Sequence, residues 1–263
     1  MSDQPAPPTS VPDAPSTPST GVPALFAPAH DRAERRRLWL LVVFVLCLAV
    51  VPDLHWALRT WLDEPPALGT GWPAMEVAIY LIERSVRVVL PLVCLLAIIG
   101  FPFRSLGLWR IRSVDVTITV ALLIVTLPMT HLLRSIIAAI VEPRYFGIVL
   151  APGSLAEWFI CIFADAFNAV AEELAIWGVL YVCLRRLWHR NEWASLLVAA
   201  LTFGSYHIYQ GVDGFIVITI MGLLHGVFFR LTRRLWPLII AHAATNISIT
   251  LMASLPAITQ TAP

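Results

Sequence analysis

The chain has 263 residues, of which 58% are hydrophobic and only 13% are charged. Soluble globular domains carry about a quarter charged residues, so this composition excludes an ordinary soluble domain and indicates a polytopic membrane protein. The net charge is +1, all 18 basic residues are arginine, and we expect no nucleic-acid partner. The four cysteines lie in apolar segments without the paired spacing of a metal site or a disulfide framework.

The first 30 residues hold eight of the 20 prolines and few large apolar side chains. Such a segment cannot bury enough surface to offset its ordering entropy. We therefore predict a disordered cytoplasmic tail over 1–37, ending in the basic stretch DRAERRR at 31–37. The apolar run that follows, 38–51, allows a signal peptide or an uncleaved first span reaching about Arg59. Its distance from the N-terminus and the lack of a clear small-x-small site favour the span.

Six further apolar runs are long enough to cross a bilayer, which takes about 20 residues of helix. They cover 74–101, 114–133, 155–184, 193–209, 213–231 and 235–255. The sequence therefore predicts an all-α membrane helix bundle of about seven transmembrane helices, multi-pass in the cell membrane. We divide it into N-terminal helices over 38–133, an amphipathic loop over 134–154 that lies at the interface or re-enters, a core over 155–255, and a short tail over 256–263.

Arginine placement orients this bundle with its N-terminus in the cytoplasm. With seven spans, 13 of the 18 arginines fall on the inner side: Arg32, Arg35, Arg36, Arg37, Arg104, Arg110, Arg112, Arg185, Arg186, Arg190, Arg230, Arg233 and Arg234. Only Arg59, Arg134 and Arg144 fall outside, and Arg84 and Arg87 lie within a span. This asymmetry agrees with the positive-inside rule.

The fourth span contains the stretch NAVAEELAIWGVL, which places Glu172 and Glu173 inside the bilayer. Charged groups at this depth are costly and are usually functional. Asn168 and Asp165 lie four and seven positions before Glu172 and share its helix face, whereas Glu173 points about 100° away. This polar stripe must face a partner, water or a cavity, because lipid would leave it unsatisfied.

Two later spans carry FGSYH, ending at His207, and AHAATN, with His242 and Asn246 one turn apart. A buried glutamate can take a proton from water, and histidine and amide N–H groups can donate to an oxyanion, so these residue types suit hydrolysis. Histidine and asparagine also serve as hydrogen-bonding contacts between membrane helices. We favour that packing role for His225 and, with hydration, for Asp165 and Asn168. We interpret Glu83, Arg84 and Arg87 as a structural ion pair or an interfacial cluster, because Arg87 lies four positions after Glu83.

The three pieces in this order resemble the CPBP family of CAAX-prenyl-protease and bacteriocin-processing membrane proteins, also called Abi. The family pattern is Glu-Glu-x-x-x-Arg, then Phe-x-x-x-His, then His-x-x-x-Asn or a similar residue. Here it reads EELAIW at 172–177, FGSYH at 203–207 and HAATN at 242–246. The resemblance covers about residues 155–250, including LWP before the last histidine.

The resemblance implies a glutamic-type endopeptidase in which Glu172 activates water with help from His207. It implies that His242 and Asn246 form the oxyanion site and that Glu173 orients neighbouring groups. We expect no cofactor. If the enzyme used zinc instead, the resemblance would make Glu172, His207 and His242 its ligands, although no His-Glu-x-x-His pair is present.

One position departs from the family pattern, because Trp177 stands where the arginine would be. Glu173 then needs another partner, such as an arginine from a different span, or is protonated. A silent membrane adaptor of the same fold is therefore one alternative function. A proton-coupled carrier using Asp165, Asn168 and Glu172 is another, although the spans show no inverted repeat.

The expected partners are the bilayer and a peptide or protein substrate: a membrane-bound peptide, a bacteriocin-type leader or a lipidated C-terminus. At about 1.5 Å per residue, the predicted helix boundaries place Glu172 roughly 18 Å, His207 roughly 21 Å and His242 roughly 10 Å from the inner ends of their helices. These depths differ by more than a hydrogen bond allows. The convergence of these groups therefore rests on the resemblance more than on the predicted spans.

Overall fold

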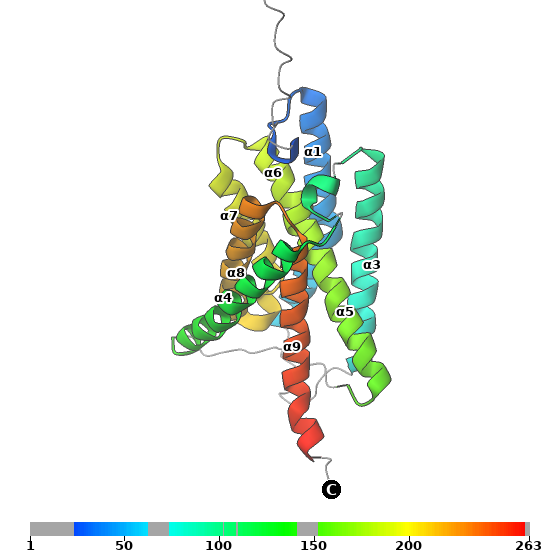
Figure 1. Cartoon of the computed structure of the whole chain (residues 1–263), viewed down its shortest axis with the longest axis vertical. Coiled ribbons are helices and arrows are strands. Elements are labelled where there is room, and N and C mark those ends of the chain that lie inside the picture. The colour runs from blue at the N-terminus through cyan, green and yellow to red at the C-terminus, as the bar shows by residue number, and fades with distance from the viewer. Residues whose placement is uncertain (1–23, 63–73, 102, 109, 141–151, 261–263) are drawn as a thin grey trace, which may run out of the picture.

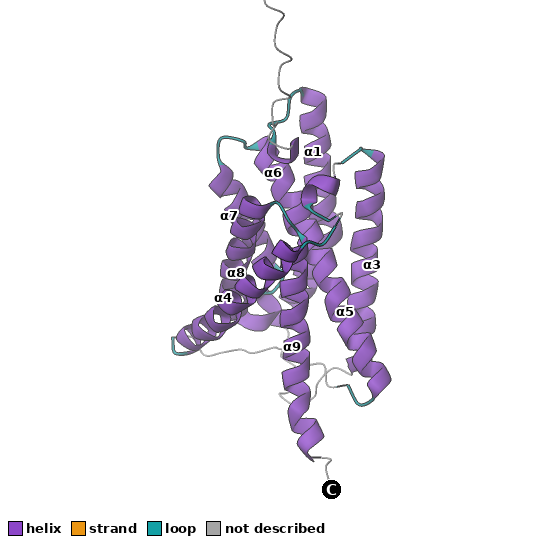
Figure 2. Ribbon diagram, viewed as in Figure 1, coloured by secondary structure: helices purple, strands orange, loops and turns teal. Residues whose placement is uncertain are grey.

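The computed structural model is a bundle of long helices (Figures 1 and 2). It describes residues 24–62, 74–101, 103–108, 110–140 and 152–260. Within these residues there are seven helical rods and no strand. The all-α prediction is confirmed.

The seven rods follow the predicted spans closely. The first joins α1 (Arg32–Val45), the π-helical turn η2 (Leu46–Val50) and α2 (Val51–Leu62). Two single helices come next, α3 (Ala74–Ile98) and α4 (Ser113–Ala138). The fourth rod joins α5 (Leu155–Glu173), the π-helix η4 (Leu174–Tyr181) and α6 (Val182–Leu187). The last three are α7 (Glu192–Ser205), α8 (Gly211–Thr232) and α9 (Trp236–Gln260), with short 3₁₀ turns η1 (Ala24–Phe26), η3 (Phe103–Leu106) and η5 (Ile208–Gln210) elsewhere.

Local chemistry explains several helix ends. Asp31, Ser154 and Asn191 cap α1, α5 and α7, each accepting a hydrogen bond from a backbone N–H three positions later. At the end of α8, Arg233 adopts a left-handed conformation with φ 54°, which turns the chain sharply into α9. Gly107, with φ 71°, lies where an added Cβ would be 2.8 Å from the Arg234 Cα, so only glycine fits beside this turn.

Within the described part of the chain, three helices are long and apolar enough by themselves to cross a membrane: Arg32–Arg59, Ser113–Ile137 and Ile208–Thr232. The rods of α3 and α5 are also long, but they carry several charged residues in their central turns. Large apolar side chains are exposed around the bundle, among them Val120 and Ile124 on α4, Leu90 on α3, and Phe159 and Phe163 on α5. A hydrocarbon environment is what such a surface requires. The chain is a membrane protein.

The rod that begins with α5 is the centre of the bundle. Every residue from 171 to 184 is buried, and this rod contacts α1, α3, α7 and α9. Its core includes Trp177 and Tyr181, both fully buried. Glu172 and Glu173 therefore lie at the level where this rod is most enclosed.

Three predicted boundaries differ from the structure. The short tail was expected over 256–263, but α9 continues to Gln260. Residues 24–37 were expected to belong to a disordered tail, but Leu25 is fully buried, the Phe26 ring lies 5.9 Å from that of Tyr181, and α1 begins at Arg32. Residues 134–138 were expected in an amphipathic loop, but they continue α4. The rest of the expected tail, 1–23, and most of the expected loop, 141–151, lie outside the described residues.

Candidate active site

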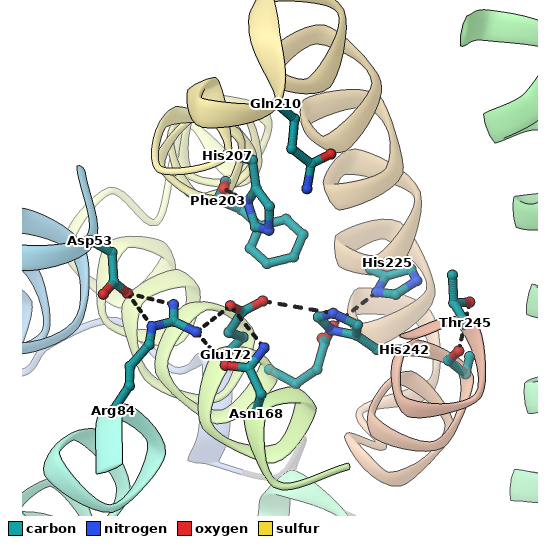
Figure 3. A network of polar contacts seen from close by, with 12 residues as sticks. Asp53, Arg84, Asn168, Glu172, Phe203, His207, Gln210, His225, His242 and Thr245 are labelled. Carbon is teal, nitrogen blue, oxygen red and sulfur yellow. Dashed lines mark hydrogen bonds and ion pairs between the residues drawn. The ribbon is translucent and has the colours of Figure 1, made fainter. Parts of the chain in front are cut away.

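A cavity of about 220 Å³ lies inside the bundle, and all five predicted site positions lie at it or directly against it. Glu172, His207, His242 and Asn246 line its wall. Glu173 is fully buried behind this wall and bonds to His242, which lines it. The side chains come from α5, the turn after α7, and α9 (Figure 3).

Glu172 has one oxygen held and one oxygen without a partner. Its Oε1 accepts hydrogen bonds from Arg84 Nη1 at 2.7 Å and from Asn168 Nδ2 at 3.2 Å. Its Oε2 has no hydrogen-bond partner among the described residues and lies 3.7 Å from His242 Nε2. An ionised carboxylate can accept at both oxygens, so Oε2 is the atom available for chemistry.

Glu173 is bound by two histidines from two other helices. Its Oε1 lies 3.1 Å from His225 Nδ1 and 2.9 Å from His242 Nδ1. His225 was expected to make a hydrogen-bonded packing contact between helices, and its contact with Glu173, from α8 to α5, is of that kind. Glu173 was expected to find another partner, such as an arginine from a different span, or to be protonated, and in the structure its partners are these two imidazoles.

His207 is oriented by the backbone. Its Nδ1 lies 2.9 Å from the Phe203 carbonyl oxygen, which can only accept, so Nδ1 carries the proton and Nε2 has a free lone pair in the neutral ring. The spacing Phe-x-x-x-His thus places the His207 ring within hydrogen-bond distance of the Phe203 carbonyl oxygen. α7 ends at Ser205, so His207 stands in the turn that follows rather than in the predicted helix 193–209.

Arg84 is the residue that sequence reasoning placed wrongly. It was expected to belong to a local cluster with Glu83 and Arg87, but those two are exposed, whereas Arg84 is 8% exposed and lines the cavity. Its guanidinium binds Asp53 on one side, with Nε 2.6 Å from Oδ2, and Asn168 and Glu172 on the other. Asn168 is therefore part of the site and not only a packing group.

Asp53 was not anticipated at all. It follows Pro52 on a stretch that looked like the end of the first span, but this rod continues to Leu62 and buries Asp53 at 5% exposure. The usable signal was that a charged group inside a membrane span needs a partner. Arg84 and Asp53 are two such groups of opposite sign in neighbouring spans.

Trp177, at the position where the family pattern has arginine, packs against α8. It is fully buried, and an added Cβ at Gly226 of α8 would lie 2.4 Å from its Cζ3 atom. Gly222 and Gly226 therefore leave the space that the indole ring occupies. The positively charged side chain beside the two glutamates is Arg84, which forms an ion pair with Glu172 and not with Glu173.

Asp165 lies further along the same face of α5 and also lines the cavity. Its Oδ2 accepts a hydrogen bond from Thr250 Oγ1 at 2.9 Å. It thus helps to hold α5 against α9, in line with the expected packing role.

The depths that disagreed in the sequence estimate are reconciled by the way the helices are offset. His242 lies near the start of α9, whereas His207 lies beyond the end of α7, and both reach the same cavity. Among the described residues, no group of three His, Cys, Asp or Glu side chains is arranged to hold a metal ion. The zinc ligand set Glu172, His207 and His242 does not fit that geometry here, so no step is derived through a metal.

Residues 152–248 match the family model for type II CAAX prenyl endopeptidase Rce1-like proteins. This segment is similar to the Rce1-like proteins. It begins just before α5 and ends within α9, so it contains every predicted site residue, and it confirms the resemblance to the CPBP proteins. No curated protein and no solved structure matches the chain.

The Rce1-like segment supports a CAAX-type intramembrane protease fold and, at that coarse level, a membrane peptidase. Arg84 and Asp53 lie outside this segment, on helices that precede it. The charge partner of Glu172 is therefore provided by a part of the chain that the family model does not cover.

Proposed function

We propose that this protein is an intramembrane endopeptidase that hydrolyses a peptide bond with water activated by Glu172. The observation that carries the proposal is that Glu172 Oε2 has no hydrogen-bond partner among the described residues, on a side chain that lines the same cavity as His207 and His242. The matching family model describes endopeptidases, and this supports peptide-bond hydrolysis as the reaction.

In the proposed step, water bound at the cavity gives one proton to Glu172 Oε2, and its oxygen adds to the carbonyl carbon. The C–N bond then breaks, and the amine leaves with the proton that Glu172 had taken. A free Nε2 on His207 is suited to hold the same water in place. Arg84 and Asn168 keep Glu172 from rotating by occupying its other oxygen.

The oxyanion that forms needs donors aimed at it. His242 lies between two carboxylates, an arrangement that stabilises an imidazolium able to donate from both ring nitrogens. Asn246, one turn later on α9, lines the same cavity and offers an amide N–H. Glu173 would act through His242, which it contacts, and not on the substrate itself.

Cleavage of a quenched peptide library by the purified protein in nanodiscs tests this proposal. Glu172→Gln should abolish cleavage, because general-base catalysis contributes about 10²- to 10⁴-fold and the amide cannot take the proton. Glu83→Gln is the matched control, because Glu83 is an exposed carboxylate next to Arg84 on α3 and should leave the rate unchanged. Equal cleavage by wild type and Glu172→Gln would refute the mechanism.

The adaptor alternative is favoured by one observation, the tryptophan at position 177. A folded wild-type protein that cleaves nothing across broad libraries would support it. The carrier alternative would require proton-coupled flux in liposomes that depends on Glu172.

A further inference from the structure

The cavity wall continues toward one end of the bundle. Its lining includes Trp56 near the end of α2, Tyr80 near the start of α3, Arg134 near the end of α4, and Gln210 just before α8. These four positions belong to helix ends that share one side, because successive rods run in opposite directions (Figure 1). We call this side, defined by Leu62, Ala74, Ala138 and Leu155, the cavity end.

The opposite side, defined by Arg32, Ser113, Leu187 and Trp236, is closed by packed side chains. Between the glutamates and this side, residues 174–184 are all buried. Leu106, Leu235 and Leu238 are each fully buried next to them in the same core. The Phe26 ring adds contacts with Tyr181 and Phe229, at 5.9 and 6.3 Å between ring centroids. Among the residues that the structure describes, this packing leaves a peptide no route to Glu172 from this side.

The closed side is also the arginine-rich side. Ion pairs on this side join Arg186 to Glu34, Arg185 and Arg230 to Glu192, and Arg234 to Asp115. The sequence adds the arginines at 35–37, 110, 112, 190 and 233, whereas it assigns only Arg59, Arg134 and Arg144 to the cavity end. The positive-inside rule places the arginine-rich side in the cytoplasm.

The lining near the cavity end has the chemistry of a membrane surface. Trp56 lies 5.0 Å from Tyr209 and 6.0 Å from Tyr80 between ring centroids, and aromatic residues of this kind gather at the interface between lipid and water. Arg134 Nη2 donates to Gln210 Oε1 at 2.8 Å in the same region. Thr126 and Thr130 extend the polar wall inward along α4.

We propose that the cavity opens on the extracytoplasmic face and takes its substrate from there. The substrate class is then a peptide segment of an exported or membrane-anchored protein at the outer surface of the membrane. A lipidated C-terminus on the cytoplasmic side would meet the closed end of the bundle. The direction of the opening stands by itself, and the substrate class rests on the proposed peptidase function.

Cysteine accessibility tests the direction. In a chain whose four cysteines, Cys47, Cys94, Cys161 and Cys183, are replaced by alanine, Gln210→Cys and Thr130→Cys probe the cavity, and Arg190→Cys probes the exposed turn at the other side. A membrane-impermeant maleimide added to intact cells should modify Gln210→Cys and Thr130→Cys but modify Arg190→Cys only after permeabilisation. Modification of both cavity positions only after permeabilisation, or at neither stage, would overturn the proposal.

A reporter tests the substrate class. The peptide cut best in the library is fused to a single-span anchor on its outer or its inner side and expressed with wild type or Glu172→Gln. We expect at least tenfold more cleavage of the outer fusion, lost in Glu172→Gln, and preferential cleavage of the inner fusion would overturn the class. Maleimide labelling does not depend on catalysis. If the cavity cysteines are labelled from outside but the protein cleaves no peptide, the peptidase function is refuted and the direction of the opening stands.

Discussion

Arg84 on α3 and Glu172 on α5 form a buried ion pair, with Nη1 2.7 Å from Oε1, although 88 positions separate them in the chain. Asp53 lies on the other side of the same guanidinium. The arginine thus joins two carboxylates from two different rods and leaves each of them compensated. A buried charge without such a partner is strongly unfavourable, so this contact ties the N-terminal helices to the site.

Replacing Arg84 by methionine should destabilise the protein by about 3–5 kcal/mol, because Asp53 and Glu172 would remain buried without a cation. It should also lower kcat more than it changes KM, because Glu172 loses the group that orients it. Thermal unfolding in detergent and steady-state cleavage measure the two effects.

Arg84→Lys is the conservative variant and should retain part of the stability and part of the kcat that Arg84→Met loses. A lysine ammonium keeps the charge but cannot bind on both sides as the guanidinium does. Arg84 lines the cavity, so added guanidinium should partly restore cleavage in Arg84→Ala. Wild-type activity in Arg84→Met would show that the arginine has no orienting role.

The two histidines on Glu173 should differ in importance. His242→Ala should reduce kcat about 10²-fold or more, as expected for the loss of an oxyanion donor. His225→Phe keeps the volume and removes only one of the two imidazoles bound to Glu173, so it should cost about tenfold through the orientation of His242. Comparable losses for the two variants would contradict this order, and the rates are measured at saturating peptide.

Trp177→Arg restores the family residue but should not restore a family contact. The guanidinium would enter a fully buried site against Gly222 and Gly226, and Oε1 of Glu173, one turn earlier, already contacts His225 and His242. We expect a lower unfolding temperature and no gain in cleavage, with Trp177→Phe as the milder control. A more active and equally stable Trp177→Arg protein would show that the tryptophan had weakened the site.

Gly226→Ala should destabilise the protein by about 1–3 kcal/mol, because the new methyl group would overlap the Trp177 ring and the Leu196 side chain. Combining it with Trp177→Leu should recover part of this loss if the overlap is the cause. The test is a double-mutant cycle of unfolding temperatures. Strict additivity of the two changes would contradict direct contact.

Cleavage should be unaffected by metal chelators. The described residues offer no group of three side chains placed to bind a metal ion, and Glu172 Oε2 can act on water directly. The measurement is peptide cleavage before and after dialysis against a chelator. Loss of activity that added zinc reverses would return Glu172, His207 and His242 to the role of ligands.

The sequence alone determined the class of the molecule and most of its site. Apolar runs of about 20 residues can satisfy their backbone in lipid only as helices, so their number predicted the seven rods. The glutamate pair, His207, His242 and Asn246 were recognisable because charged and polar groups are rare at that depth. The arginine distribution, too, is a property of the sequence and needed no coordinates.

Only the tertiary structure decided which of these groups meet. Spacing along one helix shows a shared face but not the neighbouring helix, so Arg84 was grouped with Glu83 and Arg87 in a local cluster, while its partners in the structure are Asp53 and Glu172. The same limit hid the contact of His225 with Glu173 and the fit of Trp177 against two glycines of α8. Pairing across helices depends on their tilt, offset and rotation, which are set by the packing of the whole bundle.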